Sequence, residues 1–520
     1  MTTDLSRTAD STFRNPSPTA GLARLFVGLL FAGCSMLLPA GCGGEAQVES
    51  DDEFASTGGD TGEELTAGGA PVLGWVSSAL QHDTNARAYV TGWACRRSQS
   101  RPIAVSLYAS GTLLGSVLAD DPAYSADDAA AIRGKCATTA SGFRFRILLS
   151  RRSRLEHFGE ELTVRVAGQI LPGTHHRMPG LNPSASMDIP QVWFGPLAPS
   201  RPSGTHGYAG NDFFNLFPSQ GHAVPWSKSL SRLTAFQLFG GWLDDVRADG
   251  TVNNPMAATD AELDRVIDFL REHGVALAVE LPALQDPALH VPSPSECALK
   301  GLNAPYGIYR VKRLQKIIGQ VNARAGNSAL ADLDYLTLDE PFTHAAIAAS
   351  GCLSIDETAR HVAYTVKQMQ SYFPSARIGL VEWVHVYTQT GISAQTFISV
   401  LEAYRRAVGK YPAHLHLDMD HPPSADQWAL EVQVARDVQT YCRSHGIKFG
   451  IIYNSEASTN AGWTSGALSM AKSYESAGHL PSHAIFESWF DHPTTYVPES
   501  TSNTFTNLIA QYLHWKGALP

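Results

Sequence analysis

The sequence predicts a (β/α)₈ barrel preceded by a small all-β sandwich. Three observations lead to this fold class. From about residue 189 onward, apolar strand-like segments alternate with helical patterns eight times. Before that, over residues 71–188, short strand-like segments follow one another at regular spacing with no helical period. The chain of 520 residues, 44% of them hydrophobic, is long enough for about two or three domains with ordinary cores.

The first 42 residues have the features of an export signal. Three arginines precede an apolar run over residues 25–40, and small residues lead up to Cys42. This ending resembles a bacterial lipobox, which implies that Cys42 becomes the lipidated first residue of the mature protein. The alternative is an ordinary cleaved signal in which Cys42 has no role. We therefore expect a bacterial cell-envelope protein that is lipid-anchored to a membrane or the cell surface, or secreted if the lipobox is not used.

The charge of the chain is unevenly distributed. The formal net charge is −10, but residues 43–70 hold eight acids and no base in a Gly- and Ser-rich stretch. That composition predicts a disordered, self-repelling linker. The remaining residues, 71–520, carry a charge of only −3. Such a near-neutral body offers no basic surface for nucleic acid and no polybasic membrane patch, so membrane contact is expected through the lipid anchor alone.

The expected sandwich spans residues 71–188. Its strand-like segments are 88–93, 103–109, 112–118, 142–149 and 162–167. The stretch Gly92-Trp93-Ala94-Cys95 and the later Gly142-Phe143-Arg144 resemble accessory modules fused to exported bacterial hydrolases. Such a module either binds carbohydrate or acts as a spacer and packing unit. With no obvious row of exposed aromatic residues, the second role is favoured.

Export to an oxidising compartment favours disulfides. We expect two bonds, one between Cys95 and Cys136 in the sandwich and one between Cys297 and Cys352 in barrel loops. Cys442 lies on a helical pattern and is expected to be a buried thiol. None of the cysteine spacings is typical of a zinc site.

The expected barrel spans residues 189–520. Its strands are predicted at 192–195, 235–240, 275–281, 335–340, 378–383, 414–418, 448–454 and 484–489. Capping boxes that begin at Thr259, Ser354 and Ser424 mark helix starts. Glycines 274, 409 and 446 occupy positions where a helix ends in a left-handed residue. An open doubly wound sheet is the alternative, but no Gly-rich phosphate-binding motif follows the first strand.

Acidic and aromatic residues gather at the predicted strand ends. In barrels of this kind the active site forms where the strands end. The candidates there are Glu280, Asp339, Glu340, Glu382, Trp383, Asp418, Tyr453, Asn454, Glu456, Glu487 and Trp489. Glu280 shares the parity of Ala276 and Ala278, which indicates that it faces the barrel interior. Glu340 has the parity of Leu338, so either Asp339 faces inward or the strand end twists to present Glu340.

Paired carboxylates are what glycoside cleavage requires. One protonates the departing oxygen, and the other attacks the sugar or activates water. Mutual repulsion and burial would keep one of them protonated near neutral pH. The aromatic residues Trp193, Trp383 and Trp489 at strand ends support the same interpretation, because sugar rings stack on such surfaces. The sequence therefore predicts an exported glycoside hydrolase with a carbohydrate substrate.

The strand-four motif Asp339-Glu340-Pro341 resembles that of the clan of retaining β-glycosidase barrels, which carry Asn-Glu-Pro there. In that clan the acid/base glutamate ends strand four and the nucleophilic glutamate ends strand seven. The resemblance implies that Glu340 is the acid/base and Glu456 the nucleophile. It further implies that Asn454 and Trp489 contact the sugar.

Two departures from that pattern leave alternatives open. Asp339 replaces the usual asparagine, and Glu456 lies two residues past the expected strand end, so Glu487 or Glu382 could be the partner of Glu340. The Asp339-Glu340 doublet also resembles substrate-assisted N-acetylhexosaminidases, in which Asp orients an acetamido group that acts as the internal nucleophile. A non-catalytic glycan-binding surface lipoprotein is the remaining alternative.

One strand carries two histidines and an aspartate with the same parity, His414, His416 and Asp418. Alternating histidines can begin a divalent-metal site. Such pairs usually lie on a barrel's first strand, and no other predicted strand end offers a histidine. Substrate hydrogen bonds or contacts that set a tautomer are therefore favoured, and neither a metal nor another cofactor is expected.

Overall fold

The computed structural model describes a large part of the chain. The described residues are 72–77, 80–82, 88–97, 101–121, 132, 135–136, 143–173, 175–181, 189–196, 212–219, 221–244, 257–282, 308–325, 330–347, 353–389, 393–419, 425–489 and 492–519. The expected export signal, Cys42, the acidic linker, Cys297 and Cys352 lie outside the described residues. Within the described segments, no helix combines the length and apolarity that a membrane crossing requires.

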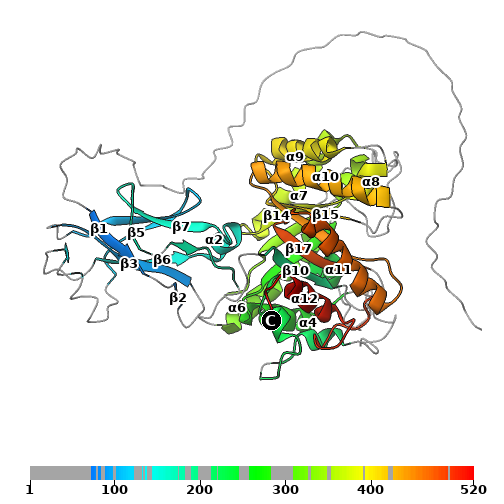
Figure 1. Cartoon of the computed structure of the whole chain (residues 1–520), viewed down its shortest axis with the longest axis horizontal. Coiled ribbons are helices and arrows are strands. Elements are labelled where there is room, and N and C mark those ends of the chain that lie inside the picture. Colours follow the sequence, from blue (N-terminus) through cyan, green and yellow to red (C-terminus); the bar gives the residue numbers. More distant parts are fainter. Residues whose placement is uncertain are drawn as a thin grey trace, which may run out of the picture. The chain divides into compact units, whose positions relative to one another are not determined.

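Eight parallel strands close into a barrel, and neighbouring strands in space are also neighbours in sequence (Figure 1). The last strand pairs with the first, Gln191 opposite His483. The strands are β10 (Gln191–Pro196), β11 (Leu233–Phe239), β12 (Ala276–Pro282), β13 (Tyr335–Asp339), β14 (Arg377–Trp383), β15 (His414–Asp418), β16 (Lys448–Tyr453) and β17 (His483–Ser488). Each begins and ends within two residues of its predicted position, so the predicted barrel is confirmed.

Helices cover the outside of the barrel (Figure 1). The longer ones are α4 (Asp260–Glu272), α6 (Ile308–Ala325), α7 (Ile355–Tyr372), α9 (Ala394–Val408), α10 (Ala425–Ser444), α11 (Asn460–Ser476) and α12 (Phe505–Trp515). Shorter ones are η1 (Phe213–Leu216), α3 (Ser227–Leu230), η2 (Gly240–Leu243), the π-helical turn η3 (Thr343–Ile347) and α8 (Val384–Gln389). The capping boxes at Thr259 and Ser354 are both formed, whereas Ser424 lies outside the described residues.

The barrel has an outer and an inner core because strand side chains alternate between its two faces. Outward apolar residues such as Val279 and Leu336 pack against the helices in one large cluster. The inner cluster combines small residues on β11 and β12 with large ones on β10 and β13. Its members on those strands are Ala235, Ala276, Ala278, Trp193 and Tyr335. The small side chains on β11 and β12 therefore leave room for the indole of Trp193 and the phenol of Tyr335, which come from the two flanking strands and meet with ring centroids 4.6 Å apart.

The N-terminal sandwich consists of two antiparallel sheets. One contains β1 (Val72–Val76), β2 (Gln81–His82), β3 (Ala88–Arg96) and β6 (Arg144–Leu149). The other contains β4 (Ala104–Ala109), β5 (Thr112–Leu118), β7 (Glu161–Val166), β8 (Gln169–Ile170) and β9 (His176–Arg177). Alternate residues of both sheets, among them Val90, Leu107 and Val164, form one apolar core, as expected for a sandwich.

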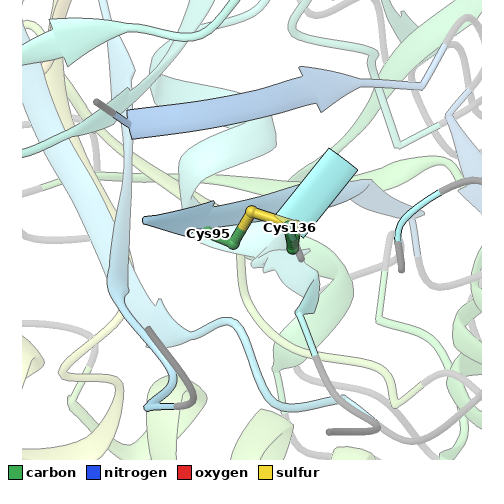
Figure 2. The surroundings of a disulfide bond; sticks show 2 residues. All are labelled: Cys95 and Cys136. Carbon is green, nitrogen blue, oxygen red and sulfur yellow. A yellow bond between two sulfur atoms is a disulfide. The ribbon is translucent and has the colours of Figure 1, made fainter. Parts of the chain in front are cut away.

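A disulfide joins Cys95 on β3 to Cys136, as predicted (Figure 2). The two residues are 41 positions apart, and both are fully buried beside Ile132 and Phe143. A cross-link that closes a loop of this length stabilises the fold mainly by restricting the unfolded chain. Cys442 is a buried free thiol, also as predicted, and burial raises its pKa to about 12.

A short helix between strands β6 and β7 of the sandwich contacts the barrel. In α2 (Arg151–Glu156), the Arg151 guanidinium donates to both carboxylate oxygens of Asp334, which precedes β13. Asp334 also accepts a hydrogen bond from the Leu277 backbone N–H at 2.9 Å. Leu155, from the same helix, belongs to the inner cluster of the barrel. Sandwich and barrel accordingly lie within one compact unit, Gly68–Pro520.

We predict that Arg151→Ala strongly destabilises the protein, because it leaves Asp334 buried, at 2% side-chain exposure, without its cation. Breaking such a pair typically costs about 3–5 kcal/mol. Arg152→Ala is the matched control, since Arg152 is 63% exposed and pairs with Glu156 one turn along the same helix; its cost should stay below about 1 kcal/mol. Urea denaturation of the two variants measures both costs, and equal losses would contradict the prediction.

Candidate active site

A polar ring occupies the interior of the barrel at the carboxyl ends of the strands. Each member lies two residues beyond an inward-facing residue of the same strand, and therefore faces the same side. Gln237 follows Ala235, Glu280 follows Ala278, and Glu487 follows Ile485, all three of which belong to the inner cluster. Asp339 on β13, Asp418 on β15 and Asn454, directly after β16, complete the ring by the same alternation.

One amide bridges two buried glutamates in this ring. Gln237 Nε2 donates to Glu280 Oε2 at 3.0 Å and to Glu487 Oε2 at 2.8 Å. These two carboxylate oxygens are therefore no more than about 6 Å apart, so the two acids lie side by side on one shared donor. Gly195 makes room for the pair, because a Cβ there would lie 3.3 Å from Glu487 Cγ.

Both glutamates have strongly raised pKa values. For Glu280 the main cause is burial, followed by repulsion from Glu487, Asp339, Glu340 and Asp418. For Glu487 the main cause is again burial, with repulsion from Asp339, while the Gln237 hydrogen bond lowers the pKa. Because the two carboxyl groups interact, they titrate as a pair, and both hold their protons to higher pH than free glutamates do.

Parity left open whether Asp339 faces the barrel interior or the strand end twists at Glu340. The structure has both an inward Asp339 and an irregular backbone at Glu340. Asp339 has the parity of the inward residues Tyr335 and Thr337, and its charge raises the pKa of both glutamates of the bridged pair. Glu340 follows with a φ of +42°, a left-handed conformation that a non-glycine residue adopts only at an energetic cost. Its backbone N–H donates to Val381 O at 3.0 Å. Both side chains are half-buried at the mouth of the barrel.

Acceptor oxygens without a described partner accumulate in the ring. Asn454 Nδ2 donates to Asp418 Oδ1 at 3.2 Å, and Gln237 Nε2 is used by the two glutamates. This leaves Gln237 Oε1, Asn454 Oδ1 and Glu487 Oε1 buried with no hydrogen-bond partner among the described residues. Buried acceptors of this kind are satisfied by a ligand or water that donates several hydrogen bonds.

Two candidates from the sequence face away from the ring, because they have the opposite parity. Tyr453 belongs to the outer core, and its hydroxyl donates to Glu475 of α11 at 2.9 Å. Glu382 lies on β14 between the inward Val381 and the half-buried Trp383, and its carboxylate accepts from residues 342, 343 and 387 outside the barrel. The expectation that these two side chains contact a substrate is therefore wrong.

The remaining candidates differ in exposure. Glu456 is exposed and lies three residues beyond the end of β16, outside the ring. Trp383 and Trp489 are half-buried at the ends of β14 and β17, where Trp489 packs on the inner cluster. Trp193 is fully buried in the barrel, with its ring centroid 4.6 Å from that of Tyr335, so the expectation that it lies at a sugar-stacking surface is wrong.

Below the ring lies a layer of three buried histidines. His416 Nε2 lies 2.9 Å from His483 Nδ1, and His414 Nε2 lies 3.0 Å from Thr337 Oγ1. Burial lowers the pKa of all three rings, that of His416 to about 3, so they are neutral near pH 7. Among the described residues, no group of three or more His, Cys, Asp or Glu side chains is arranged to hold a metal ion.

Sequence reasoning missed two of these residues. Gln237 carries no charge, so the pattern of acids at strand ends does not point to it, although it shares the parity of Ala235 on the second strand. His483 was overlooked because the last strand begins one residue earlier than predicted. Strand parity would have identified Gln237, and the pairing of His483 opposite Gly450 appears only in the structure.

Glycoside hydrolases are among the solved structures that resemble this chain. GH26C from a Muricauda species aligns with a TM-score of 0.40 and 11% identity, over 64% of this chain and 91% of that chain. A GH26 β-mannanase from Bacteroides ovatus aligns with a TM-score of 0.40 and 10% identity, over 64% and 90%. The catalytic domain of a Bacillus GH26 endo-β-1,4-mannanase aligns with a TM-score of 0.39 and 12% identity, over 64% and 90%. No protein-family model and no curated protein matches the chain. At these TM-scores and identities the likeness carries no argument about function, which depends on the site residues themselves.

The buried histidines and glutamates predict opposite pH dependences of stability. Histidines of the unfolded chain have a pKa near 6.5 and bind more protons than the three buried histidines of the folded state. The contribution of the buried histidines to the free energy of unfolding is therefore lost as the pH falls below about 6.5. The folded state retains protons on Glu280 and Glu487 at pH values above about 4.5, the pKa of a glutamate in the unfolded chain. The contribution of these two residues to the free energy of unfolding is therefore lost as the pH rises. We therefore expect the free energy of unfolding to be largest at mildly acidic pH.

Urea denaturation of the wild type and of Glu487→Gln between pH 4 and pH 8 tests this expectation. The amide cannot ionise, so the variant should lose less stability than the wild type between pH 5 and pH 8. Identical pH profiles of the two proteins would show that Glu487 does not have the raised pKa.

Proposed function

We propose that this protein is an exported glycoside hydrolase that cleaves a polysaccharide or oligosaccharide. The observation that carries the proposal is the buried pair Glu280 and Glu487, bridged by Gln237 at the barrel mouth. The half-buried Glu340 belongs to the same cluster, since its charge raises the pKa of Glu280. Several carboxyl groups in one site, two of them with strongly raised pKa values, are what acid-assisted glycoside cleavage uses.

In this mechanism Glu340 protonates the departing glycosidic oxygen. Glu487 is the second carboxylate, because it is buried inside the ring, where Gln237 Nε2 donates to it at 2.8 Å and fixes its position. It either attacks the anomeric carbon or removes a proton from the attacking water. Glu456, the strand-seven candidate, is exposed and outside the ring, which makes it the weaker choice.

The rest of the ring suits a sugar. The three unpartnered acceptor oxygens, on Gln237, Asn454 and Glu487, match a ligand rich in hydroxyl donors. Asp418 orients Asn454 through their hydrogen bond. We assign Trp383 and Trp489 to stacking on sugar rings, since both are half-buried at strand ends.

A substrate-assisted N-acetylhexosaminidase mechanism is the second candidate. It is favoured by the inward position of Asp339 directly before Glu340. In that mechanism Asp339 orients the acetamido group of the substrate, and Glu340 acts as the acid. It predicts a strict requirement for an acetamido sugar and only a modest effect of Glu487→Gln.

We predict that the purified protein hydrolyses at least one member of a panel of glycans and aryl glycosides. Glu340→Gln and Glu487→Gln should each lower kcat by about 10²–10⁴-fold, the usual contribution of a catalytic acid or base. Glu456→Gln is the control and should stay within about 3-fold of the wild type. Loss of activity in Glu456→Gln but not in Glu487→Gln would instead assign the second carboxylate to strand seven. Glycan binding without turnover by the wild type would leave only the non-catalytic function.

We further propose that the protein is lipid-anchored through Cys42 to a bacterial membrane or cell surface. Small residues before this cysteine and the apolar run over residues 25–40 support the assignment. Cys42→Ser should move the protein from the membrane fraction to the soluble fraction, or leave it as an unprocessed precursor of higher mass. Fractionation and mass spectrometry measure both outcomes, and an unchanged membrane-bound, processed protein would contradict the anchor at Cys42.

A further inference from the structure

Glu382 is a buried carboxylate that the proposed reaction does not use. It is fully buried on the outer side of β14, and four donors converge on it. Oε2 accepts from the Thr343 backbone N–H at 2.8 Å, from Thr343 Oγ1 at 2.6 Å and from the Tyr387 hydroxyl at 3.1 Å. Oε1 accepts from the Phe342 backbone N–H at 3.1 Å.

These donors belong mainly to the segment that directly follows the catalytic candidate Glu340. The Phe342 and Thr343 amides begin a short helical segment, where backbone N–H groups have no partner within the helix. Glu382 supplies the missing acceptors. Thr343 Oγ1 also accepts from the Trp383 backbone N–H at 3.3 Å, so Thr343 is tied to two consecutive residues of β14.

Glu340 needs such support because of its backbone conformation. A left-handed conformation in a residue with a side chain is unfavourable by about 1–3 kcal/mol and persists where neighbouring interactions fix it. Strand β14 holds Glu340 on both sides. Val381 O accepts from the Glu340 N–H, and the next residue, Glu382, holds positions 342 and 343.

The carboxylate at this position is energetically expensive, which argues against an incidental role. Burial raises the pKa of Glu382 to about 7, with a further contribution from the charge of Glu340, even though the hydrogen bonds from Thr343 and Phe342 lower it. A neutral side chain of similar size would avoid that cost. Only an acceptor with two oxygens can hold both backbone N–H groups and the Thr343 hydroxyl at once.

We propose that Glu382 is a positioning residue that fixes the direction of the Glu340 carboxyl group at the barrel mouth. The inference rests on the proposed function of Glu340 as the catalytic acid. Glu382 does not touch the substrate. It acts through the backbone of residues 341–343, so its loss misplaces the acid without removing it.

The test compares substrates that need the acid with substrates that do not. An aryl glycoside with a dinitrophenolate leaving group departs without protonation, whereas a sugar leaving group requires it. In Glu382→Gln the amide NH₂ faces backbone N–H donors, so the segment must shift. For the substrate with a sugar leaving group, we expect kcat/KM to fall by about 10–100-fold, the loss typical of a catalytic group misplaced by about 1 Å. For the dinitrophenyl substrate, kcat/KM should change by less than about 3-fold. Glu340→Gln should show the same dependence on the leaving group, with a larger loss.

Glu431→Gln is the matched control. Glu431 is equally buried, but its partners are His385 of α8, at 2.9 Å, and Gln427 of α10, at 2.9 Å, so it does not hold residues 341–343. It should lower stability without changing the ratio of the two kcat/KM values. If Glu382→Gln does not fold, Thr343→Val removes the 2.6 Å hydrogen bond to Glu382 and the weaker one from the Trp383 N–H, keeps both backbone donors, and should show the same dependence on the leaving group at smaller magnitude.

The outcomes separate this inference from the proposed function. A wild type that hydrolyses no member of the panel overturns the proposed function, and the role of Glu382 with it. An active wild type in which Glu382→Gln loses activity equally on both substrates, or not at all, overturns only the positioning role. Amide hydrogen exchange gives a readout independent of activity, since exchange at Phe342 and Thr343 should accelerate in Glu382→Gln and not in Glu431→Gln. Unchanged exchange there also overturns the role.

Discussion

The strict alternation of side chains along each barrel strand determines what every strand-end residue can do. A closed parallel barrel has an interior that admits only every second residue, and the others must pack against helices. Glu280 and Glu487 fall on the inner face and meet across Gln237. Glu382 and Tyr453 are equally close to strand ends but fall on the outer face, where they bind backbone amides and Glu475. Four polar residues of similar position thus divide into a buried pair inside the barrel and two structural groups outside it.

The same alternation forces several carboxyl groups into one desolvated volume. Glu280 experiences burial and four neighbouring acids, and its pKa rises accordingly. Hydrogen bonds offset only part of the free-energy cost of burying these acids. The single Gln237 NH₂ group donates to both glutamates, and the Gln237 carbonyl oxygen has no partner among the described residues. A core built for stability alone would avoid such a set of unsatisfied acceptors. The set is consistent with a site arranged for a ligand that supplies the missing hydrogen-bond donors.

Much of this arrangement was predictable from the sequence. The residues that could not be predicted show which physical information the sequence pattern lacks. Alternating segments and helix caps predicted all eight strands, and two cysteines in one small domain predicted the Cys95–Cys136 bond. Glu280 was placed correctly because its strand is regular and its small neighbours reveal the inner face. Closeness to a strand end does not distinguish the two faces of a strand, and the parity of Glu382 with Leu380, which packs in the outer core, is what excludes it from the interior. The backbone of Glu340 could not be predicted, since its left-handed turn depends on partners contributed by a neighbouring strand.

That turn explains how an adjacent Asp and Glu can both serve one site. In a regular strand, consecutive side chains point to opposite faces, so an inward Asp339 would send Glu340 toward the helices. A left-handed residue at the strand end breaks the alternation and lets the second carboxyl group remain half-buried at the mouth. The conformation is unfavourable by itself, and β14 compensates with hydrogen bonds to the residue itself and to the two amides beyond Pro341. One strand therefore supplies no reacting group to the proposed chemistry, yet its Val381 and Glu382 determine where the acid on the neighbouring strand can lie.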